Sequence, residues 1–102
     1  MISVLATLEI AEGRRDEFIK IFTELVPKVR AEEGCIEYAP WIDLESTIAS
    51  RDEPRADVVV AIEKWESVEA LEAHLIAPHM LEFRKSVEGL VAGLTLDILE
   101  PA

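Results

Sequence analysis

Two histidines, a glutamate and a tryptophan lie close together in the segment EKWESVEALEAHLIAPHM, residues 63–80. His74 and His79 are the two histidines of the whole chain, and Glu63 and Trp65 precede them in the same segment. An imidazole can take up or release a proton near neutral pH, and a neighbouring carboxylate orients the ring and tunes its pKa. The segment therefore has the residue types for general acid–base chemistry on a small molecule.

Both histidines are candidate catalytic residues, each with a structural alternative. His79 follows Pro78, which favours a first helical position, and the helix dipole there disfavours the imidazolium and leaves a neutral base. The alternative for His79 is a hydrogen-bonded residue that only fixes a helix break. His74 shares a helix face with Leu71 and Leu75, so it points inward as a second base or as a satisfied core histidine. Residues five apart lie on different sides of a continuous helix and no third ligand is evident, so we expect no metal site.

Glu63 is the third candidate catalytic residue. It lies two residues from Trp65 in a predicted strand, so both side chains point to the same face. If this face meets the helices, Glu63 is a carboxylate in an apolar pocket and needs a partner, such as His74, His79, a tyrosine hydroxyl or water. The alternative is a solvated Glu63 at the end of the strand. Trp65 is expected as a pocket wall or as a core anchor.

Aromatic residues complete the candidate substrate-binding set. Tyr38 and Trp41 fall on opposite faces of a regular strand, and we select Tyr38 because its hydroxyl can bind a substrate oxygen. Plain aromatic packing is the alternative use of this ring. Phe83 lies on one helical stripe with His79. The candidate substrate-binding residues are therefore Trp65, Tyr38 and Phe83.

The hydrophobic pattern predicts the elements that position these residues. The predicted strands cover residues 2–10, 35–44, 58–65 and 94–99, and the predicted helices cover residues 14–31, 68–75 and 79–90. Ser67 is the expected N-cap of the second helix, Gly34 the cap of the first and Gly93 the stop of the third. Pro40 restricts its strand to a sheet edge or a bulge. Residues 45–57 form a polar connection.

The order β-α-β-β-α-β, with the second helix split in two, is the ferredoxin-like plan of an α+β fold. It predicts an antiparallel sheet covered by helices on one face. In the third strand, which we expect to be central, Val58, Val60 and Ile62 alternate with Val59 and Ala61, so apolar side chains emerge on both faces. A second subunit whose sheet packs on this other face would bury its apolar side chains, so we expect a homodimer.

Composition narrows the class of protein. The 102 residues are expected to form a single domain, residues 1–102, and the formal net charge of −11 argues against binding to nucleic acid or to anionic membrane lipids. Charges interrupt every apolar run before the roughly 18 residues that a membrane span needs. The first residues, MISVLATLEI, have the pattern of a strand and not of a signal peptide, so we expect a cytoplasmic protein. Cys35 is alone, which excludes an internal disulfide.

The segments EEGCIEY at 32–38 and IEKWESVEALEAHLIAPHM at 62–80 resemble the signature segments of the antibiotic biosynthesis monooxygenase domain, which includes quinol monooxygenases. The likeness spans essentially the whole chain. The resemblance implies a dimeric α+β barrel with a pocket between sheet and helices in each subunit. Because relatives of this fold also include haem-degrading enzymes and isomerases, the fold alone does not settle the chemistry.

The resemblance implies a cofactor-independent monooxygenase that acts with O₂ on a small electron-rich aromatic, such as a hydroquinone or a polyketide phenol. His79, assisted by Glu63 or His74, would remove the phenolic proton. No flavin-binding loop, phosphate-binding glycine cluster or metal constellation in the sequence indicates a cofactor. Two alternatives remain: an isomerase of a small oxygenated metabolite that uses the same base, and a non-catalytic dimeric module that binds a small molecule.

Overall fold

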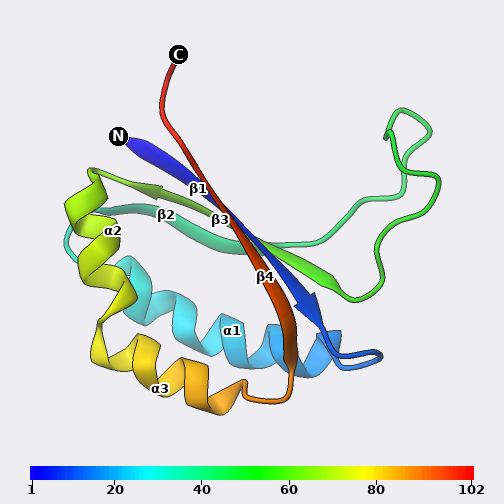
Figure 1. Ribbon diagram of the computed structural model, residues 1–102, viewed down its shortest axis with the longest axis horizontal. Coiled ribbons are helices and arrows are strands. Elements are labelled where there is room, and N and C mark those ends of the chain that lie inside the picture. The colour runs from blue at the N-terminus through cyan, green and yellow to red at the C-terminus, as the bar shows by residue number, and fades with distance from the viewer.

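The computed structural model describes residues 1–102 as four strands and three helices (Figure 1). The strands are β1 (Ile2–Ile10), β2 (Cys35–Trp41), β3 (Val58–Trp65) and β4 (Val91–Leu99), and the helices are α1 (Arg15–Arg30), α2 (Val68–Leu75) and α3 (Pro78–Ser86). The strands form one antiparallel sheet in the order β2-β3-β1-β4. This arrangement confirms the predicted ferredoxin-like α+β class. None of the helices is both long enough and apolar enough to cross a membrane.

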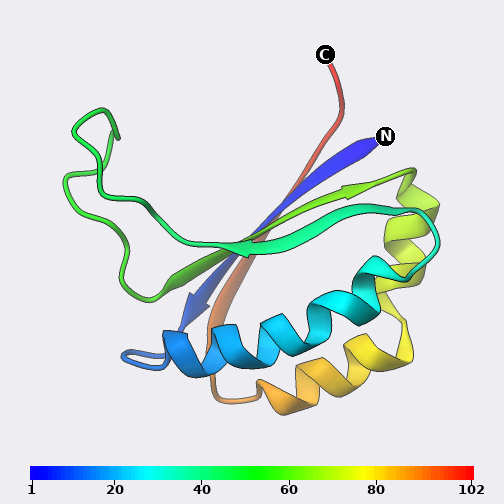
Figure 2. The ribbon, with the colours of Figure 1, turned by 180° about the vertical axis from the view of Figure 1, so that it is seen from behind.

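The helices lie on one face of the sheet, with α1 and α3 side by side below it (Figure 2). On that face β3 buries Val59, Ala61, Glu63 and Trp65, whereas the alternate residues of β3 are partly exposed on the opposite face. This period of two is the signature of a strand with one covered face. The core therefore forms between the sheet and the apolar stripe of α1, which includes Phe18 and Phe22.

The sheet order confirms two predictions about the strands. β3 lies between β2 and β1, as expected for its β-branched residues, and β2 with Pro40 is an edge strand. The register of β2 against β3 also shifts between Cys35 and Glu37. The shift leaves Tyr38 opposite Glu63, with both side chains buried.

The end of the third helix differs from the prediction. α3 ends at Ser86, and the chain turns through Gly89, which has a φ of 82°, before β4 begins at Val91. Gly93 was expected to stop the helix but lies within β4 opposite Glu9, where an added Cβ would collide with the glutamate side chain. Gly93 therefore lies in a strand, where a side chain would meet the end of the Glu9 side chain, and it is not a helix terminus.

Gly34 also has a role other than the predicted one. The C-cap of α1 is Ala31, three residues earlier. Gly34 has a φ of 85°, and a Cβ built there would lie 2.6 Å from the Cβ of Ala70 in α2. Glycine is needed here because the loop after α1, residues 31–34, approaches α2 too closely for a side chain.

The predicted polar connection before β3 is confirmed. It contains neither helix nor strand and extends beyond the sheet, away from α2 (Figure 1). Arg55, near its end, binds Asp43, near its start. The Arg55 guanidinium donates to both carboxylate oxygens of Asp43, at 2.9 and 2.8 Å, and its backbone N–H donates to the same side chain. These bonds hold the pKa of Asp43 well below its usual range.

Candidate active site

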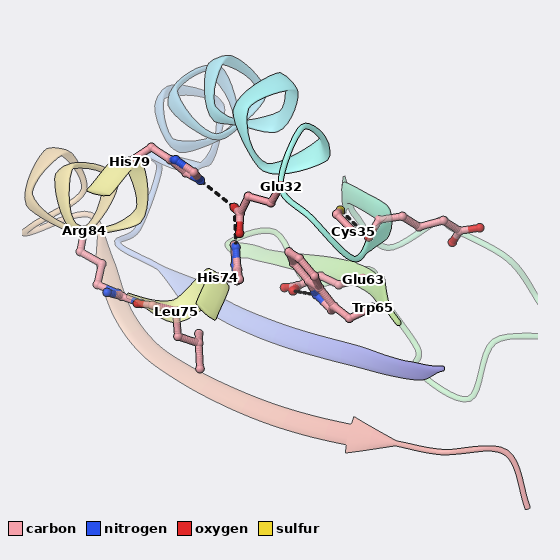
Figure 3. Close-up of polar contacts among 9 residues, drawn as sticks. Glu32, Cys35, Glu63, Trp65, His74, Leu75, His79 and Arg84 are labelled. Carbon is pink, nitrogen blue, oxygen red and sulfur yellow. Dashed lines mark hydrogen bonds and ion pairs between the residues drawn. The ribbon is translucent and has the colours of Figure 1, made fainter. Parts of the chain in front are cut away.

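The break between α2 and α3 places the two histidines. The Oγ of Ser67 accepts a hydrogen bond from the backbone N–H of Ala70 at 3.1 Å, which confirms the predicted N-cap of α2. Pro78 opens α3, as expected. His74 lies in the last turn of α2 and His79 in the first turn of α3, and both rings turn toward the loop after α1 (Figure 3).

Glu32, in that loop, joins the two histidines. Its Oε2 lies 2.9 Å from Nδ1 of His74 and 2.6 Å from Nε2 of His79, so one carboxylate oxygen binds both imidazoles (Figure 3). The Glu32 side chain is 13% exposed. Glu32 was not among the predicted site residues, because it is separated from the histidines by more than forty positions in the chain. The one local signal was its place just before Gly34, in a segment that marks the family resemblance.

A cavity of about 450 Å³ lies between the sheet and the helices, where the family resemblance implied a pocket. Most of its wall is apolar and comes from β1, β3, β4 and all three helices: Ala6, Leu8, Phe22, Ala61, Leu71, Leu75, Met80, Val87, Val91, Leu94 and Leu96. The cavity is open beside β4, where Leu94 and Leu96 remain exposed because the helices do not cover this edge strand. Its size suits one small ring system.

His74 is the imidazole of this cavity. Its side chain is 2% exposed, and its ring lies 4.6 Å from the indole of Trp65 and 5.5 Å from the ring of Tyr38, centroid to centroid. Nδ1 bonds to Glu32, whereas Nε2 has no hydrogen-bond partner. Because no fully buried side-chain nitrogen or oxygen lacks a partner, Nε2 is not fully buried, and His74 is one of the residues that line the cavity. Burial lowers the pKa of His74, the bond to Glu32 opposes this effect, and the nearby His79 adds to it.

Glu63 is the buried carboxyl group of the cavity. It is 5% exposed, and its Oε1 accepts a hydrogen bond from the Trp65 indole N–H at 3.0 Å. The indole N–H replaces the imidazole, hydroxyl or water expected as its partner. Burial raises the pKa of Glu63 to about 7, although the bond from Trp65 opposes the rise and the charge of Glu32 adds to it. Glu63 therefore exists at neutral pH as a mixture of acid and carboxylate. The expected carboxylate–imidazole pair forms with Glu32 instead.

The other predicted site residues divide between the cavity and its surroundings. Tyr38 and Phe83 line the cavity, and the Tyr38 ring stacks on Phe22 with centroids 5.3 Å apart. Burial raises the pKa of the Tyr38 hydroxyl, so it stays protonated and can donate. Trp65 is fully buried behind Glu63 and does not line the cavity, which agrees with the core-anchor alternative.

His79 lies outside the cavity as well. It lines a separate groove of about 150 Å³ between α1 and α3, together with Glu24, Lys28 and Glu82. Its side chain is 23% exposed, so the ring reaches water on this side. The structure thus brings His74 and His79 together through Glu32 but places them on two different surfaces.

The thiol and the acidic groups do not form a metal centre. No set of three or more histidine, cysteine, aspartate or glutamate side chains has an arrangement that could hold a metal ion. Burial raises the pKa of the Cys35 thiol, with the charge of Glu32 adding to the effect, so the reactive thiolate form is disfavoured. The buried polar side chains that line the cavity are His74, Glu63 and Tyr38, and the exposed Arg84 and Glu88 line it as well.

Comparison with known proteins identifies the family and supports the fold. The family model described as antibiotic biosynthesis monooxygenase matches residues 1–86. The Escherichia coli K12 protein named "Probable quinol monooxygenase YgiN" is 38% identical over 103 aligned residues, which cover 99% of this chain and 98% of that protein. A crystal structure of PA3566 from Pseudomonas aeruginosa is similar with a TM-score of 0.81 and 27% identity, over 99% of this chain and 93% of that one. The structure of Rv0793 from Mycobacterium tuberculosis, at 24% identity and a TM-score of 0.77 over 99% and 94% of the two chains, shares the fold. The chain belongs to the antibiotic biosynthesis monooxygenase family.

Proposed function

We propose that this protein is a cofactor-independent monooxygenase that oxidises a small electron-rich aromatic, a hydroquinone or a polyketide phenol, with O₂. Family membership supports monooxygenase activity, and the similarity to a relative named as a quinol monooxygenase supports a hydroquinone. The observation that carries the proposal is the free Nε2 of His74, which opens onto an apolar cavity large enough for one small aromatic.

His74 is the proposed base. Because Glu32 accepts from Nδ1, the hydrogen bond selects the tautomer in which Nε2 has a lone pair. The lowered pKa of His74 favours the neutral ring over the imidazolium. His74 can then take the phenolic proton at Nε2. A phenolate held in an apolar cavity gives up an electron to O₂ more readily than the phenol does.

The overall reaction balances without another oxidant or reductant. A hydroquinone and O₂ give a hydroxylated quinone and one water: one oxygen atom enters the ring, the other is reduced to water, and the substrate supplies all four electrons. In its neutral form Glu63 can donate a hydrogen bond to a substrate oxygen, and Tyr38 can do the same from the neighbouring strand. These two donors would orient the ring, and Phe83 would pack against it.

The test is oxygen uptake with a panel of hydroquinones in metal-free buffer. We expect His74→Gln to reduce turnover by about 10²- to 10⁴-fold, the usual contribution of a general base. His79→Gln is the matched control and should reduce turnover less, because His79 does not line the cavity. Uptake that survives both substitutions at the wild-type rate contradicts the proposal. Turnover under anaerobic conditions would indicate an isomerase instead, and binding without turnover would indicate a binding module.

We also propose a homodimer that covers the outer face of the sheet. Leu5, Val60 and Ile62 lie on the face opposite the helices and are only half-buried, and Trp41 on the same face is 56% exposed. A second copy of this face is the self-complementary partner that two-fold symmetry provides. Ile62→Glu should convert the dimer mass in light scattering to a monomer mass, whereas Ile76→Glu, at a 74% exposed position, should not. A wild-type monomer at micromolar concentration contradicts the dimer.

A further inference from the structure

The Glu32 carboxylate connects two surfaces that do not otherwise share a titratable group. His74 is part of the cavity wall and His79 is part of the wall of the groove between α1 and α3. Both rings bind the same oxygen of Glu32, at 2.9 and 2.6 Å, so the cavity and the groove are separated by two hydrogen bonds. The chain has no other histidine, and it uses both of them in this arrangement.

We propose that Glu32 joins His74 and His79 into one proton-exchange unit, with His74 as its end in the cavity and His79 as its end in the water-filled groove. The claim deepens the proposed function, on which it rests for the identity of the proton that His74 takes up. It assigns Glu32 and His79 as positioning residues that act through His74 and do not touch the substrate.

The exchange conserves protons and charge. When His74 gains the substrate proton at Nε2 it becomes a cation, and the one negative charge of Glu32 then faces two imidazole rings. A positive charge on His74 disfavours a positive charge on His79, because like charges on neighbouring rings oppose each other, so a proton on Nδ1 of His79 can leave to water in the groove. One proton enters from the cavity and one leaves to the groove, so the net charge of the unit is unchanged. When His74 returns its proton to the reduced oxygen, His79 takes one up again.

Charged groups on the neighbouring elements act on both ends. Arg84 of α3 lies close enough to His74 to oppose its protonation, and Glu63 faces the same cavity from β3. In the groove, Glu24 and Lys28 of α1 lie beside His79, as does Glu82 of α3. The groove therefore contains acidic groups that can pass a released proton on to bulk water.

The first experiment measures the coupling without any turnover. Because the chain has two histidines, ¹⁵N-histidine NMR resolves the titration of each ring in the free protein. Replacing the His79 imidazole by a neutral amide in His79→Gln should raise the pKa of His74, because the charge of His79 lowers it, and Glu32→Gln should lower the pKa of His74, since the carboxylate favours the imidazolium. Ser86→Ala, which changes the groove without removing a charge, is the control and should leave His74 unchanged. A His74 titration that is the same in His79→Gln and in the wild type overturns the proposal.

The second experiment measures the exchange during turnover. His79→Ala should lower oxygen uptake partially, and imidazole added to the buffer should restore it, because a small base can enter the groove and replace the lost ring. Glu32→Gln should lower uptake by about 10- to 100-fold, the range for loss of a group that orients a functional histidine, and imidazole should not restore it. A loss in His79→Ala that imidazole does not relieve overturns the exchange role. A protein with coupled histidine titrations but no oxygen uptake would instead refute the proposed function and leave the unit itself standing.

Discussion

Glu32 and Glu63 are two carboxyl groups beside the packed rings of His74 and Trp65, but their surroundings differ. Glu32 is in a loop and accepts hydrogen bonds from two imidazoles, whereas Glu63 is in the central strand β3 and accepts one from an indole. An imidazole can become a cation and balance a carboxylate, but an indole N–H cannot. The comparison shows that the hydrogen-bond partner of each carboxyl group, more than its burial, decides which of the two can form an ion pair with a charged histidine.

The two regions also differ in how the chain builds them. The Glu63 region depends on strand alternation, which places Glu63 and Trp65 on the buried face with no special turn. The Glu32 region depends on a glycine with positive φ and on a helix break at Pro78. Substitutions in the two regions should therefore have effects of different kinds, on ionisation in the first and on geometry in the second.

The largest expected effect is on the pH dependence of stability at Glu63. Folding raises its pKa from 4.5 to about 7, so between these values the unfolded chain loses a proton that the folded chain keeps. The free energy of unfolding should fall by about 3 kcal/mol as the pH rises through this window, and it should then level off. Glu63→Gln lacks this contribution. Urea unfolding of the wild type and of Glu63→Gln at several pH values gives the difference between their free energies of unfolding. A difference that stays constant from pH 4 to pH 8 contradicts the raised pKa.

A smaller effect is expected at Gly34. Gly34→Ala forces a Cβ against Ala70, at 2.6 Å, while Gly89→Ala meets nothing within 4 Å at a similar φ of 82°. The shared cost of the left-handed backbone cancels between the two variants. Gly34→Ala should therefore be less stable than Gly89→Ala by about 2 kcal/mol, the usual cost of overpacking. It should also displace Glu32 and change the His74 titration in NMR. Equal stability of the two variants would show that the loop and α2 can separate freely.

The sequence predicted the Glu63 region better than the Glu32 region. The period of two in β3 placed Glu63 and Trp65 on one face and left open whether that face is buried, and the Ser67 cap and the Pro78 break identified α2 and α3. These signals are local, so they can be read from a few neighbouring residues. They placed His74 facing inward, whereas Tyr38 was selected over Trp41 for its hydroxyl and not for its place on the covered face.

The partnerships could not be predicted in the same way. Glu32 meets His74 across more than forty residues, and no periodic pattern encodes a contact at that separation. Gly34 and Gly93 were interpreted as helix stops because glycine often ends a helix, although Gly34 packs closely against α2 and Gly93 lies within β4 beside the Glu9 side chain. His79 was predicted as a catalytic base of the pocket from its place at the start of a helix. The helical stripe did not show that its ring faces a groove between α1 and α3.

The indole bond to Glu63 provides a finer test of the comparison. In the native protein the hydrogen bond from the Trp65 indole N–H lowers the pKa of Glu63. Trp65→Phe keeps an aromatic ring but removes this N–H donor. The pKa of Glu63 should therefore rise above 7 by about one unit, because a hydrogen bond to a charged group is worth roughly 1.5 kcal/mol or more. Carboxyl ¹³C NMR follows this titration, and Glu63→Gln identifies the signal by its loss. An unchanged midpoint would show that burial alone sets the pKa.

The smallest expected effect is at the N-cap of α2, the helix that contains His74. Ser67→Ala removes the hydroxyl that accepts from the backbone N–H of Ala70, so one donor of the first turn loses its protein partner. The free energy of unfolding should fall by about 1 kcal/mol. Ser86→Ala is a matched control, because its hydroxyl only donates to an exposed carbonyl at the end of α3, and it should change stability by less than about 0.5 kcal/mol. If the two variants are equally stable, the close contact of the loop after α1 with Ala70, and not the cap, fixes the start of α2.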